Sequence, residues 1–186
     1  MITDPRPRPL GIGQVPAAVE LMSREMGAGY VTEDGLMDLI RGGGLVLAAR
    51  ARGGVLAGVV TTIHPDLVKT VVVAPEWRRR GIGTALLAEA THRLATAGAD
   101  EVRCLAWVRR GGFVPAARLL VRAGFHPIRI IPEAWREDSL RRGYACPDCG
   151  HPCVCSAVEY RIEWSALKEG RVGRLGGRVG PPPPKN

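Results

Sequence analysis

The chain has 186 residues, of which 46% are hydrophobic, and its formal net charge is +8 at neutral pH. This length favours one domain with a real core, and this composition excludes a chain that is disordered throughout. No apolar run reaches the length of a membrane span, and the N-terminus lacks the pattern of a signal peptide, so we expect a cytoplasmic protein.

The first part of the chain predicts two helices followed by three strands. Prolines alternate with arginines over residues 1–9, which predicts a mobile extended arm, and a short strand is expected near 10–13. Amphipathic spacing predicts helices over Val15–Met26 and Glu33–Arg41. Runs of β-forming residues predict the strands 45–51, 55–63 and Leu67–Val73.

The second part alternates helices with strands and then carries an insertion. A helix is expected from Thr84 to residue 97, where apolar residues recur at spacings of three and four. It is followed by a strand over 101–108, a helix over 115–123, and strands over His126–Ile131 and 156–164. Residues 132–155 are expected to be an irregular insertion, and residues 165–186 a disordered tail. This order predicts an α/β fold, with a mixed sheet covered by helices on both faces.

The most informative stretch is a strand, a basic glycine loop and a helix over residues 71–97. Glycines let a ligand approach the backbone, arginines offer charged donors, and the first amides of a helix have no internal partner. The stretch therefore suits a pyrophosphate, although it is neither a Walker A loop nor a three-glycine dinucleotide fingerprint. The pyrophosphate itself is expected to lie against the amides of Arg79 to Thr84. The residues expected to bind the whole ligand that carries it are Val71, Val72, Val73, Arg78, Arg79, Arg80, Gly81, Ile82, Gly83 and Thr84.

This pattern, V-x-P-x-x-R-x-x-G-x-G between a strand and a helix, resembles the acetyl-CoA loop of the GNAT N-acetyltransferases. A second motif of that family follows, a strand, a short helix and Gly-Phe at residues 124–125. The resemblance covers residues 10–131 and returns near 156–164. It implies a splayed GNAT-like sheet, acetyl-CoA as co-substrate, and acetyl transfer to an amine. It also implies that the main chain of Val71 and Val73 holds the pantetheine, and that an N–H near Val73 polarises the thioester. The plain alternative is a glycine turn with solvated arginines.

The usual catalytic groups of that family are missing from their positions. Many members carry a tyrosine where this chain has Leu120, and an asparagine is often found where it has Phe113. A thiolate can leave without a protein acid, because its conjugate acid has a pKa of about 8.5. Tyr144 and Tyr30 are candidate acids and His64 is a candidate base, but the sequence assigns neither role.

Four of the five cysteines lie between residues 146 and 155, inside the insertion. C-P-x-C-G is the turn of a zinc knuckle, and four thiolates can close a tetrahedral site for structural Zn²⁺. The expected ligands are Cys146, Cys149, Cys153 and Cys155, with His151 as a substitute. A disulfide pair, free thiols and an iron–sulfur cluster are the alternatives. In the family this connection commonly walls the acceptor site, so we hypothesise that the knuckle shapes acceptor specificity and takes no part in transfer.

Two functions follow from the sequence. One is an N-acetyltransferase acting on a small amine, a protein N-terminus or a lysine side chain. The other is a catalytically idle GNAT-fold adaptor that binds through its knuckle and basic tail. Half of the excess positive charge falls on residues 165–186, which have no aromatic side chains for base stacking, so nucleic acid is the less favoured partner. No membrane partner is expected, and the oligomeric state is left open.

Overall fold

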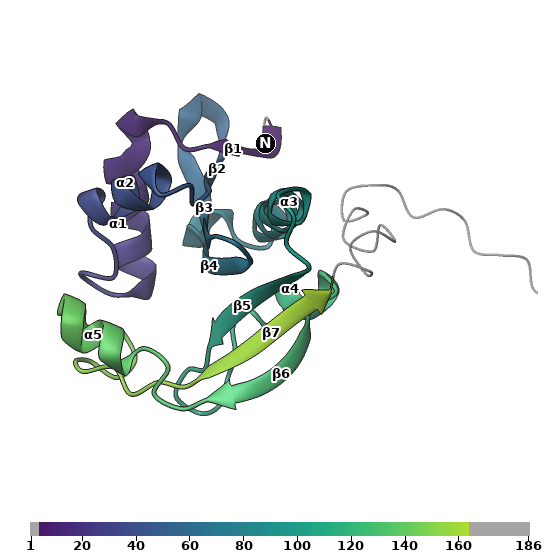
Figure 1. The fold of residues 1–186 in the computed structure, drawn as a ribbon. Coiled ribbons are helices and arrows are strands. Elements are labelled where there is room, and N and C mark those ends of the chain that lie inside the picture. Colours follow the sequence, from purple (N-terminus) through teal and green to yellow (C-terminus); the bar gives the residue numbers. More distant parts are fainter. Residues whose placement is uncertain (1–3, 164–186) are drawn as a thin grey trace, which may run out of the picture.

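The computed structural model describes residues 4–163 (Figure 1). The strands are β1 (Asp4–Pro9), β2 (Val46–Arg50), β3 (Leu56–Ile63), β4 (Leu67–Val73), β5 (Glu101–Trp107), β6 (His126–Ile131) and β7 (Ala157–Glu163). The α-helices are α1 (Val15–Met26), α2 (Glu33–Arg41), α3 (Ile82–Thr96), α4 (Ala117–Arg122) and α5 (Arg136–Arg142). Short 3-10 turns lie at Ile12–Gln14, Arg52–Gly54 and Pro75–Trp77.

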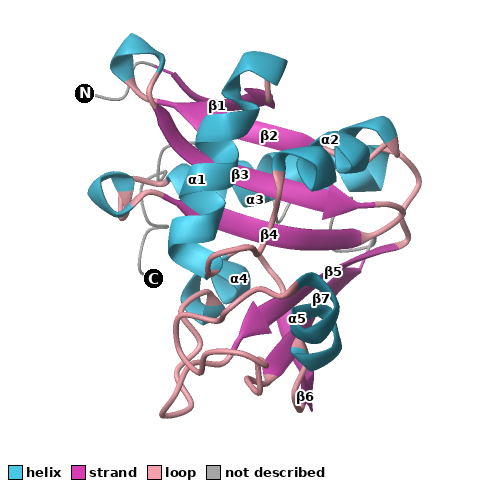
Figure 2. Cartoon of the chain, turned by 90° about the vertical axis from the view of Figure 1, so that its left-hand side faces the viewer, coloured by secondary structure: helices cyan, strands magenta, loops and turns pink. Residues whose placement is uncertain are grey.

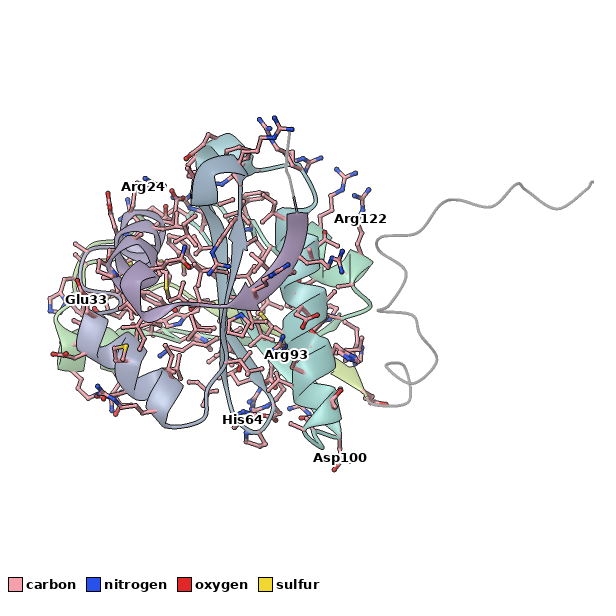
Figure 3. All side chains as sticks on the ribbon, turned by 90° about the horizontal axis from the view of Figure 1, so that it is seen from above. Arg24, Glu33, His64, Arg93, Asp100 and Arg122 are labelled. Carbon is pink, nitrogen blue, oxygen red and sulfur yellow. The ribbon has the colours of Figure 1, made fainter. Side chains whose placement is uncertain are left out.

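The strands form one mixed sheet in the order β1-β2-β3-β4-β5-β7-β6. All neighbours are antiparallel except β4 and β5, which run parallel. Helices α1 and α2 cover one face and α3 covers the other, which Figure 3 shows with the sheet seen edge-on. The predicted mixed α/β sheet with helices on both faces is therefore confirmed.

The sheet opens between its two parallel strands. β4 and β5 pair only where they begin, at Leu67 with Arg103 and at Val68 with Cys104. The rest of β4 continues beside β3 up to Val73, and the rest of β5 continues beside β7 up to Trp107. The strands diverge below β4 in Figure 2. This gap between the carboxyl ends of β4 and β5 is the predicted splay, and it gives a ligand access to unpaired main-chain groups.

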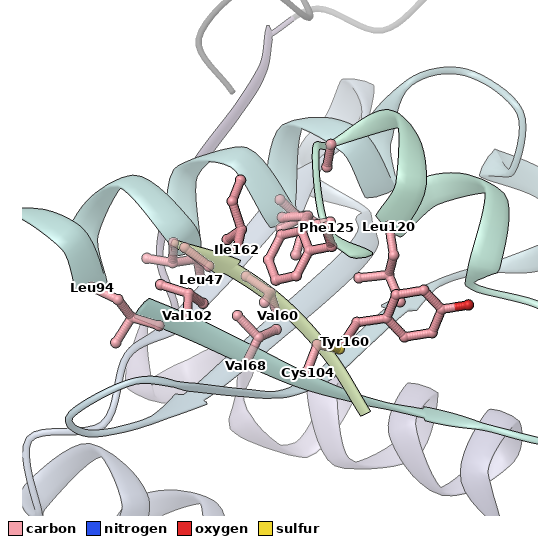
Figure 4. Packing of buried hydrophobic residues seen from close by; sticks show 14 of the residues in the cluster. Leu47, Val60, Val68, Leu94, Val102, Cys104, Leu120, Phe125, Tyr160 and Ile162 are labelled. Carbon is pink, nitrogen blue, oxygen red and sulfur yellow. The ribbon is translucent and has the colours of Figure 1, made fainter. Parts of the chain in front are cut away.

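Each face of the sheet has its own hydrophobic core. On the α3 side, Leu86, Leu87 and Leu94 are fully buried against strand residues and against α4 (Figure 4). Burying each such side chain contributes roughly 1.5–3 kcal/mol to folding. On the α1 and α2 side, Met22 and Leu36 pack with a group that includes the knuckle cysteines. The knuckle is therefore part of a core rather than an appendage.

The expected mobile arm over residues 1–9 and strand near 10–13 are wrong for the described residues. Asp4–Pro9 is the edge strand β1, and Ile12–Gln14 is a 3-10 turn. The N–H of Leu10 bonds to the carbonyl of Val46 at 2.8 Å, so the residues two and four before it also direct their N–H groups at β2. The alternating prolines then place their missing N–H groups on the outer edge, where no ladder needs them.

The insertion is also more regular than expected, because it contains α5. Acidic residues occupy the first turn of α5 and arginines the last, which complements the helix dipole. Gly143 ends the helix with φ of 71°. These start and stop signals were present in the sequence and predict this helix when the segment is considered by itself.

The remaining predicted elements are confirmed with shifts of a few residues at their ends. The largest shift is at α4, which begins at Ala117 rather than 115, and α3 begins at Ile82, two residues before Thr84. The predicted disordered tail over 165–186 lies outside the described residues, as do residues 1–3 of the predicted arm. Within residues 4–163, no helix is both long and apolar enough to cross a membrane.

Candidate active site and metal centre

The predicted cofactor loop, residues 78–83, passes directly into α3. Gly81 caps the helix with a φ of 81°, a left-handed conformation that glycine adopts without steric cost. Arg79 also has a positive φ, 61°, which is unusual for a residue with a side chain. No side chain caps α3, and its first internal bond is made by Ala85 N–H to the Gly81 carbonyl. The preceding helical amides are therefore available to an anion.

The three arginines of this loop have different surroundings. Arg78 donates from Nε to the Val73 carbonyl at 3.1 Å and pairs with Glu25 at the end of α1. Arg80 stacks over Trp77, with its guanidinium carbon 4.9 Å from the ring centroid. Arg79 is exposed. Arg78 thus ties the loop to α1 and to the end of β4, whereas Arg79 and Arg80 are exposed beside the start of α3.

Main-chain groups of β4 face the gap. Ala74 donates its N–H to Ala57 of β3 at 3.0 Å, and Val72 is paired with Val59. Because main-chain groups alternate in direction along a strand, the N–H groups of Val71 and Val73 point the opposite way, toward β5. β5 does not pair with them. The structure therefore presents two unpaired donors where the resemblance requires them.

The positions of the missing catalytic residues are occupied by apolar side chains. Leu120 is 1% exposed within the α3-side core, and Phe113 is 64% exposed. Tyr160 of β7, which was not predicted as a site residue, is buried in the same core as Leu120, and both are labelled in Figure 4. Of the three tyrosines, Tyr160 alone belongs to the α3-side core. No spacing pattern predicts it, because Tyr160 lies 40 residues after Leu120 in the chain.

The other candidates are placed on the opposite face or at the opposite end. His64 is exposed in the turn before β4, and the length of β4, about 20 Å, separates this turn from Val73. Figure 3 shows His64 at the periphery. Tyr30 donates to or accepts from Thr70 Oγ1 at 2.7 Å, and its ring meets Tyr144 edge-on at 5.7 Å. Burial raises the pKa of both tyrosines. The structure brings the tyrosines together, and it does not bring His64 to the gap.

Four thiols converge in the knuckle, residues 146–155. The Sγ atoms of Cys146, Cys149, Cys153 and Cys155 all lie within 4.8 Å of one another. The separations of three pairs are 3.8, 3.7 and 3.3 Å. A tetrahedral Zn²⁺ with Zn–S bonds of about 2.3 Å needs sulfurs about 3.8 Å apart, whereas a disulfide needs about 2.05 Å. The geometry fits a four-thiolate metal centre, and all four cysteines are unpaired.

Backbone donors around the thiols suit thiolate ligands. Asp148 N–H points to Cys146 Sγ at 3.4 Å, and Val154 N–H to Cys149 Sγ at 3.3 Å. Burial raises the pKa of Cys149, but hydrogen bonds from Val154 and the neighbouring thiols outweigh it, so this pKa falls below its ordinary value. Burial raises the pKa of Cys155 to about 11. A bound cation would be needed to hold all four groups as thiolates.

His151 is used in the support of the knuckle rather than in its metal centre. Its Nδ1 lies 3.1 Å from Ser139 Oγ and 3.1 Å from the Tyr144 carbonyl. The fully buried Ser139 of α5 bonds to the Tyr144 carbonyl at 2.9 Å and accepts from Cys153 N–H at 3.1 Å. The substitute-ligand role is not needed, since four sulfurs already converge. Cys104 lies in β5, outside the knuckle, and burial raises the pKa of its thiol to about 12.

The knuckle is also fastened to the loop that follows β5. Asp148 Oδ1 accepts from Arg109 Nη2 at 2.8 Å, and its Oδ2 accepts from Arg110 N–H at 2.7 Å. Arg109 stacks over Trp107, 4.8 Å from the ring centroid. These contacts link the knuckle to the residues that follow the carboxyl end of β5.

Comparison with known proteins agrees with this architecture. Residues 42–127 match the model of the acetyltransferase (GNAT) domain. This segment runs from before β2 to the start of β6, so it includes the cofactor loop and both strands that border the gap. A search of curated proteins finds no significant match. The matched segment thus resembles a GNAT acetyltransferase domain, and the chain has a GNAT-like fold.

Solved structures with a similar fold include three acetyltransferases. A ribosomal-protein-alanine N-acetyltransferase from Brucella melitensis is 16% identical, with a TM-score of 0.63 over 84% of this chain and 98% of that one. The spermidine/spermine N-acetyltransferase SpeG from Vibrio cholerae is 14% identical, with a TM-score of 0.65 over 88% and 95%. The putative acetyltransferase yncA from Salmonella typhimurium, solved with its cofactor acetyl-CoA, is 15% identical, with a TM-score of 0.63 over 95% and 96%.

Proposed function

We propose that this chain transfers an acetyl group from acetyl-CoA to a primary amine. The observation that supports this most is the gap between β4 and β5, which leaves the N–H groups of Val71 and Val73 unpaired beside an uncapped helix N-terminus. The pyrophosphate would lie against the first amides of α3 with Arg79 and Arg80, and the pantetheine would run along β4. Arg78 would hold the loop and strand in register.

In the proposed reaction the neutral amine attacks the carbonyl carbon of the thioester. A C–N bond forms, the C–S bond breaks, CoA leaves as a thiolate, and the proton lost by nitrogen ends on that sulfur. The Val73 N–H would donate to the carbonyl oxygen as negative charge develops on it. No cofactor other than acetyl-CoA is required for this balance.

We further assign the delivery of the proton to Tyr160, in place of the tyrosine that Leu120 replaces. Its ring is buried on the α3 side, in the same hydrophobic core as Leu120. Tyr160→Phe removes one hydroxyl and keeps the packing. We expect kcat to fall about tenfold or more, with the Kd for acetyl-CoA unchanged, because general acids typically contribute 10²–10⁴ and a thiolate is a good leaving group. An unchanged kcat would remove Tyr160 from the mechanism.

The activity itself is tested by release of free CoA thiol from acetyl-CoA with a panel of amines. We expect release that depends on a primary amine and an acetylated product of matching mass. The result that would favour the idle adaptor is binding of acetyl-CoA without turnover of any small amine, peptide N-terminus or lysine peptide. The apolar residues Leu120 and Phe113 at the usual catalytic positions are consistent with that alternative.

We also propose that the four cysteines of the knuckle hold one structural Zn²⁺. Support comes from the mutual Sγ distances, the N–H···S contacts and the place of three of the four cysteines in the core. Metal analysis should give one zinc per chain, and Cys146→Ser with Cys149→Ser should abolish it, whereas Cys104→Ala should not. Protein that contains no metal and takes up neither Zn²⁺ nor Co²⁺ would refute the site.

A further inference from the structure

Two arginines of α4 lie next to the predicted cofactor loop. They are Arg118 and Arg122, and Leu119 between them faces the start of α3, because a methyl group placed on Gly83 would lie 3.4 Å from its Cδ2 atom. The following residue, Leu120, is buried in the α3-side core and fixes the helix there. α4 and its two arginines are therefore neighbours of the helix amides that we assign to the pyrophosphate.

The two side chains can act on the same ligand. Arg118 and Arg122 are four positions apart, so they leave the same face of the helix with Cβ atoms about 5–6 Å apart. Both are exposed to solvent. Figure 3 shows Arg122 and Asp100, the latter after the last residue of α3, toward opposite ends of that helix. The arginine pair is therefore on the side of the molecule where α3 begins.

The charges of this pair are not neutralised by the protein. Within residues 4–163, neither Arg118 nor Arg122 forms an ion pair or a side-chain hydrogen bond. α4 contains no acidic residue, and none lies in the first turn of α3. Arg103 of β5, in contrast, is paired with Asp66 at 2.8 Å. Like charges four residues apart destabilise a helix, so an anionic ligand explains this pair better than folding does.

CoA carries a second phosphate that is suited to these arginines. Its pyrophosphate is joined to the 5′ carbon of an adenosine, and the 3′ oxygen of the same ribose carries a phosphate monoester, which has about two negative charges at neutral pH. With pantetheine in the gap, the adenosine must leave the loop on one of its other flanks. The flank toward α1 is occupied by the pair of Arg78 and Glu25, whose carboxylate repels a phosphate. The flank toward α4 offers two unpaired guanidinium groups instead.

We propose, on the basis of the function proposed above, that Arg118 and Arg122 form a site for the 3′-phosphate of CoA. Guanidinium groups bind phosphate oxygens through paired, charge-assisted hydrogen bonds, and two of them match the charge of a monoester. The site selects a thioester that is carried on the free nucleotide. A thioester on the phosphopantetheine arm of a carrier protein has no adenosine 3′-phosphate, so it would leave both arginines without a partner.

The test is a calorimetric titration of the full-length protein with CoA and with dephospho-CoA, which differ only in the 3′-phosphate. We expect wild type to bind CoA about tenfold or more tightly than dephospho-CoA, and this ratio to fall as salt is raised. In the double variant Arg118→Gln with Arg122→Gln the ratio should fall to about two or less, through loss of affinity for CoA. Arg136→Gln with Arg141→Gln removes two charges from exposed positions of α5 and should keep the wild-type ratio. Circular dichroism confirms that each variant is folded.

Three outcomes would overturn the inference. CoA and dephospho-CoA could bind wild type equally well, or the α4 double variant could weaken both ligands by the same factor, which would assign the arginines to the pyrophosphate. The α5 control could also lower the ratio as much as the α4 variant does, which would indicate a general effect of net charge. Failure of both ligands to bind wild type would instead refute the proposed function, so the two failures are distinguishable.

Discussion

At the scale of single residues, Arg79 combines an unfavourable conformation with a place in the cofactor loop. A non-glycine residue in the left-handed region costs about 1–2 kcal/mol, and such costs are typical of residues retained for function. Its φ is 61° and its side chain is exposed. The positive charge at this position is therefore better explained by an anionic ligand than by folding.

Replacing Arg79 with glycine should separate stability from binding. We expect the free energy of unfolding of Arg79→Gly to equal that of wild type or to exceed it by up to about 1 kcal/mol. Glycine adopts this φ without strain, and the greater freedom of glycine in the unfolded chain offsets part of that gain. The Kd for acetyl-CoA should rise several-fold and depend less on salt, since a phosphate contact is lost. Denaturant unfolding and titration at two salt concentrations measure both, with Arg41→Ala on α2 as the control. A destabilised variant with unchanged affinity would show that Arg79 is structural.

Glu159 is a second residue whose role follows from its surroundings. Its carboxylate is 1% exposed and accepts from Arg129 at 2.6 Å and from Arg161 at 2.9 Å. Burial raises the pKa of Glu159, but the two guanidinium groups outweigh burial and hold the pKa below its ordinary value of 4.5. Folding thus favours the charged form of Glu159. The contribution of this charge to the free energy of unfolding is fully present above pH 4.5 and is lost as the pH falls through the lower pKa of the folded state.

Glu159→Gln should therefore destabilise the fold at neutral pH and much less in acid. We expect a loss of about 1–3 kcal/mol at pH 7, typical of hydrogen bonds to a charged group. The difference from wild type should begin to shrink below pH 4.5, where the unfolded wild-type chain takes up the proton, and should be lost once the pH falls below the lower pKa of the folded state, where the native carboxylate is protonated as well. Urea unfolding between pH 3 and 7 tests this, and Glu163→Gln on the same strand, which is exposed, is the control. A difference independent of pH would refute the ion-pair account.

At the scale of elements, Ser139 joins α5 to the knuckle. Its hydroxyl is fully buried and bridges the Tyr144 carbonyl and the Cys153 N–H. Ser139→Ala should cost about 1–3 kcal/mol, because two buried backbone groups lose their partner. It should also weaken the affinity for Zn²⁺ and speed amide exchange over 136–155, measured with a competing chelator and by hydrogen exchange. Thr96→Ala removes a hydroxyl at an exposed site and should change neither.

The elements that sequence alone predicted are those with strong local signals. The Thr32 cap of α2, the valine run of β4 and the glycines around α3 each act within a few residues of one another. The strand β1 was missed because its prolines are tolerated only on the outer edge of a sheet, and edge position is a property of topology. The helix α5 was not predicted because the whole of residues 132–155 was interpreted as one irregular cysteine-bearing insertion.

The candidate site likewise has a part that local sequence patterns predict and a part that they do not. The loop and the metal ligands are contiguous in sequence, so spacing predicted them, and the thiols do converge. Tyr160, the Asp148–Arg109 contact and the Tyr30–Tyr144 pair join residues that lie far apart in the chain. No local pattern predicts such contacts, because the sheet order that creates them is set by the whole fold.

At the scale of the whole molecule, the gap between β4 and β5 organises both cores and both proposed ligands. The loop of residues 78–83 and α3 lie on one side of it, and the Tyr30–Tyr144 pair and the knuckle lie on the other. In the proposed reaction, acetyl-CoA and the amine would meet at the unpaired N–H of Val73.

The measurement that tests this account most directly is a calorimetric titration of the purified, zinc-loaded chain with acetyl-CoA. The account predicts one molecule bound per chain, with an affinity that falls as salt is raised, and slower amide exchange at residues 71–73 and 80–84 in the complex. Absence of binding at millimolar acetyl-CoA, or binding that leaves the exchange of these amides unchanged, would contradict it.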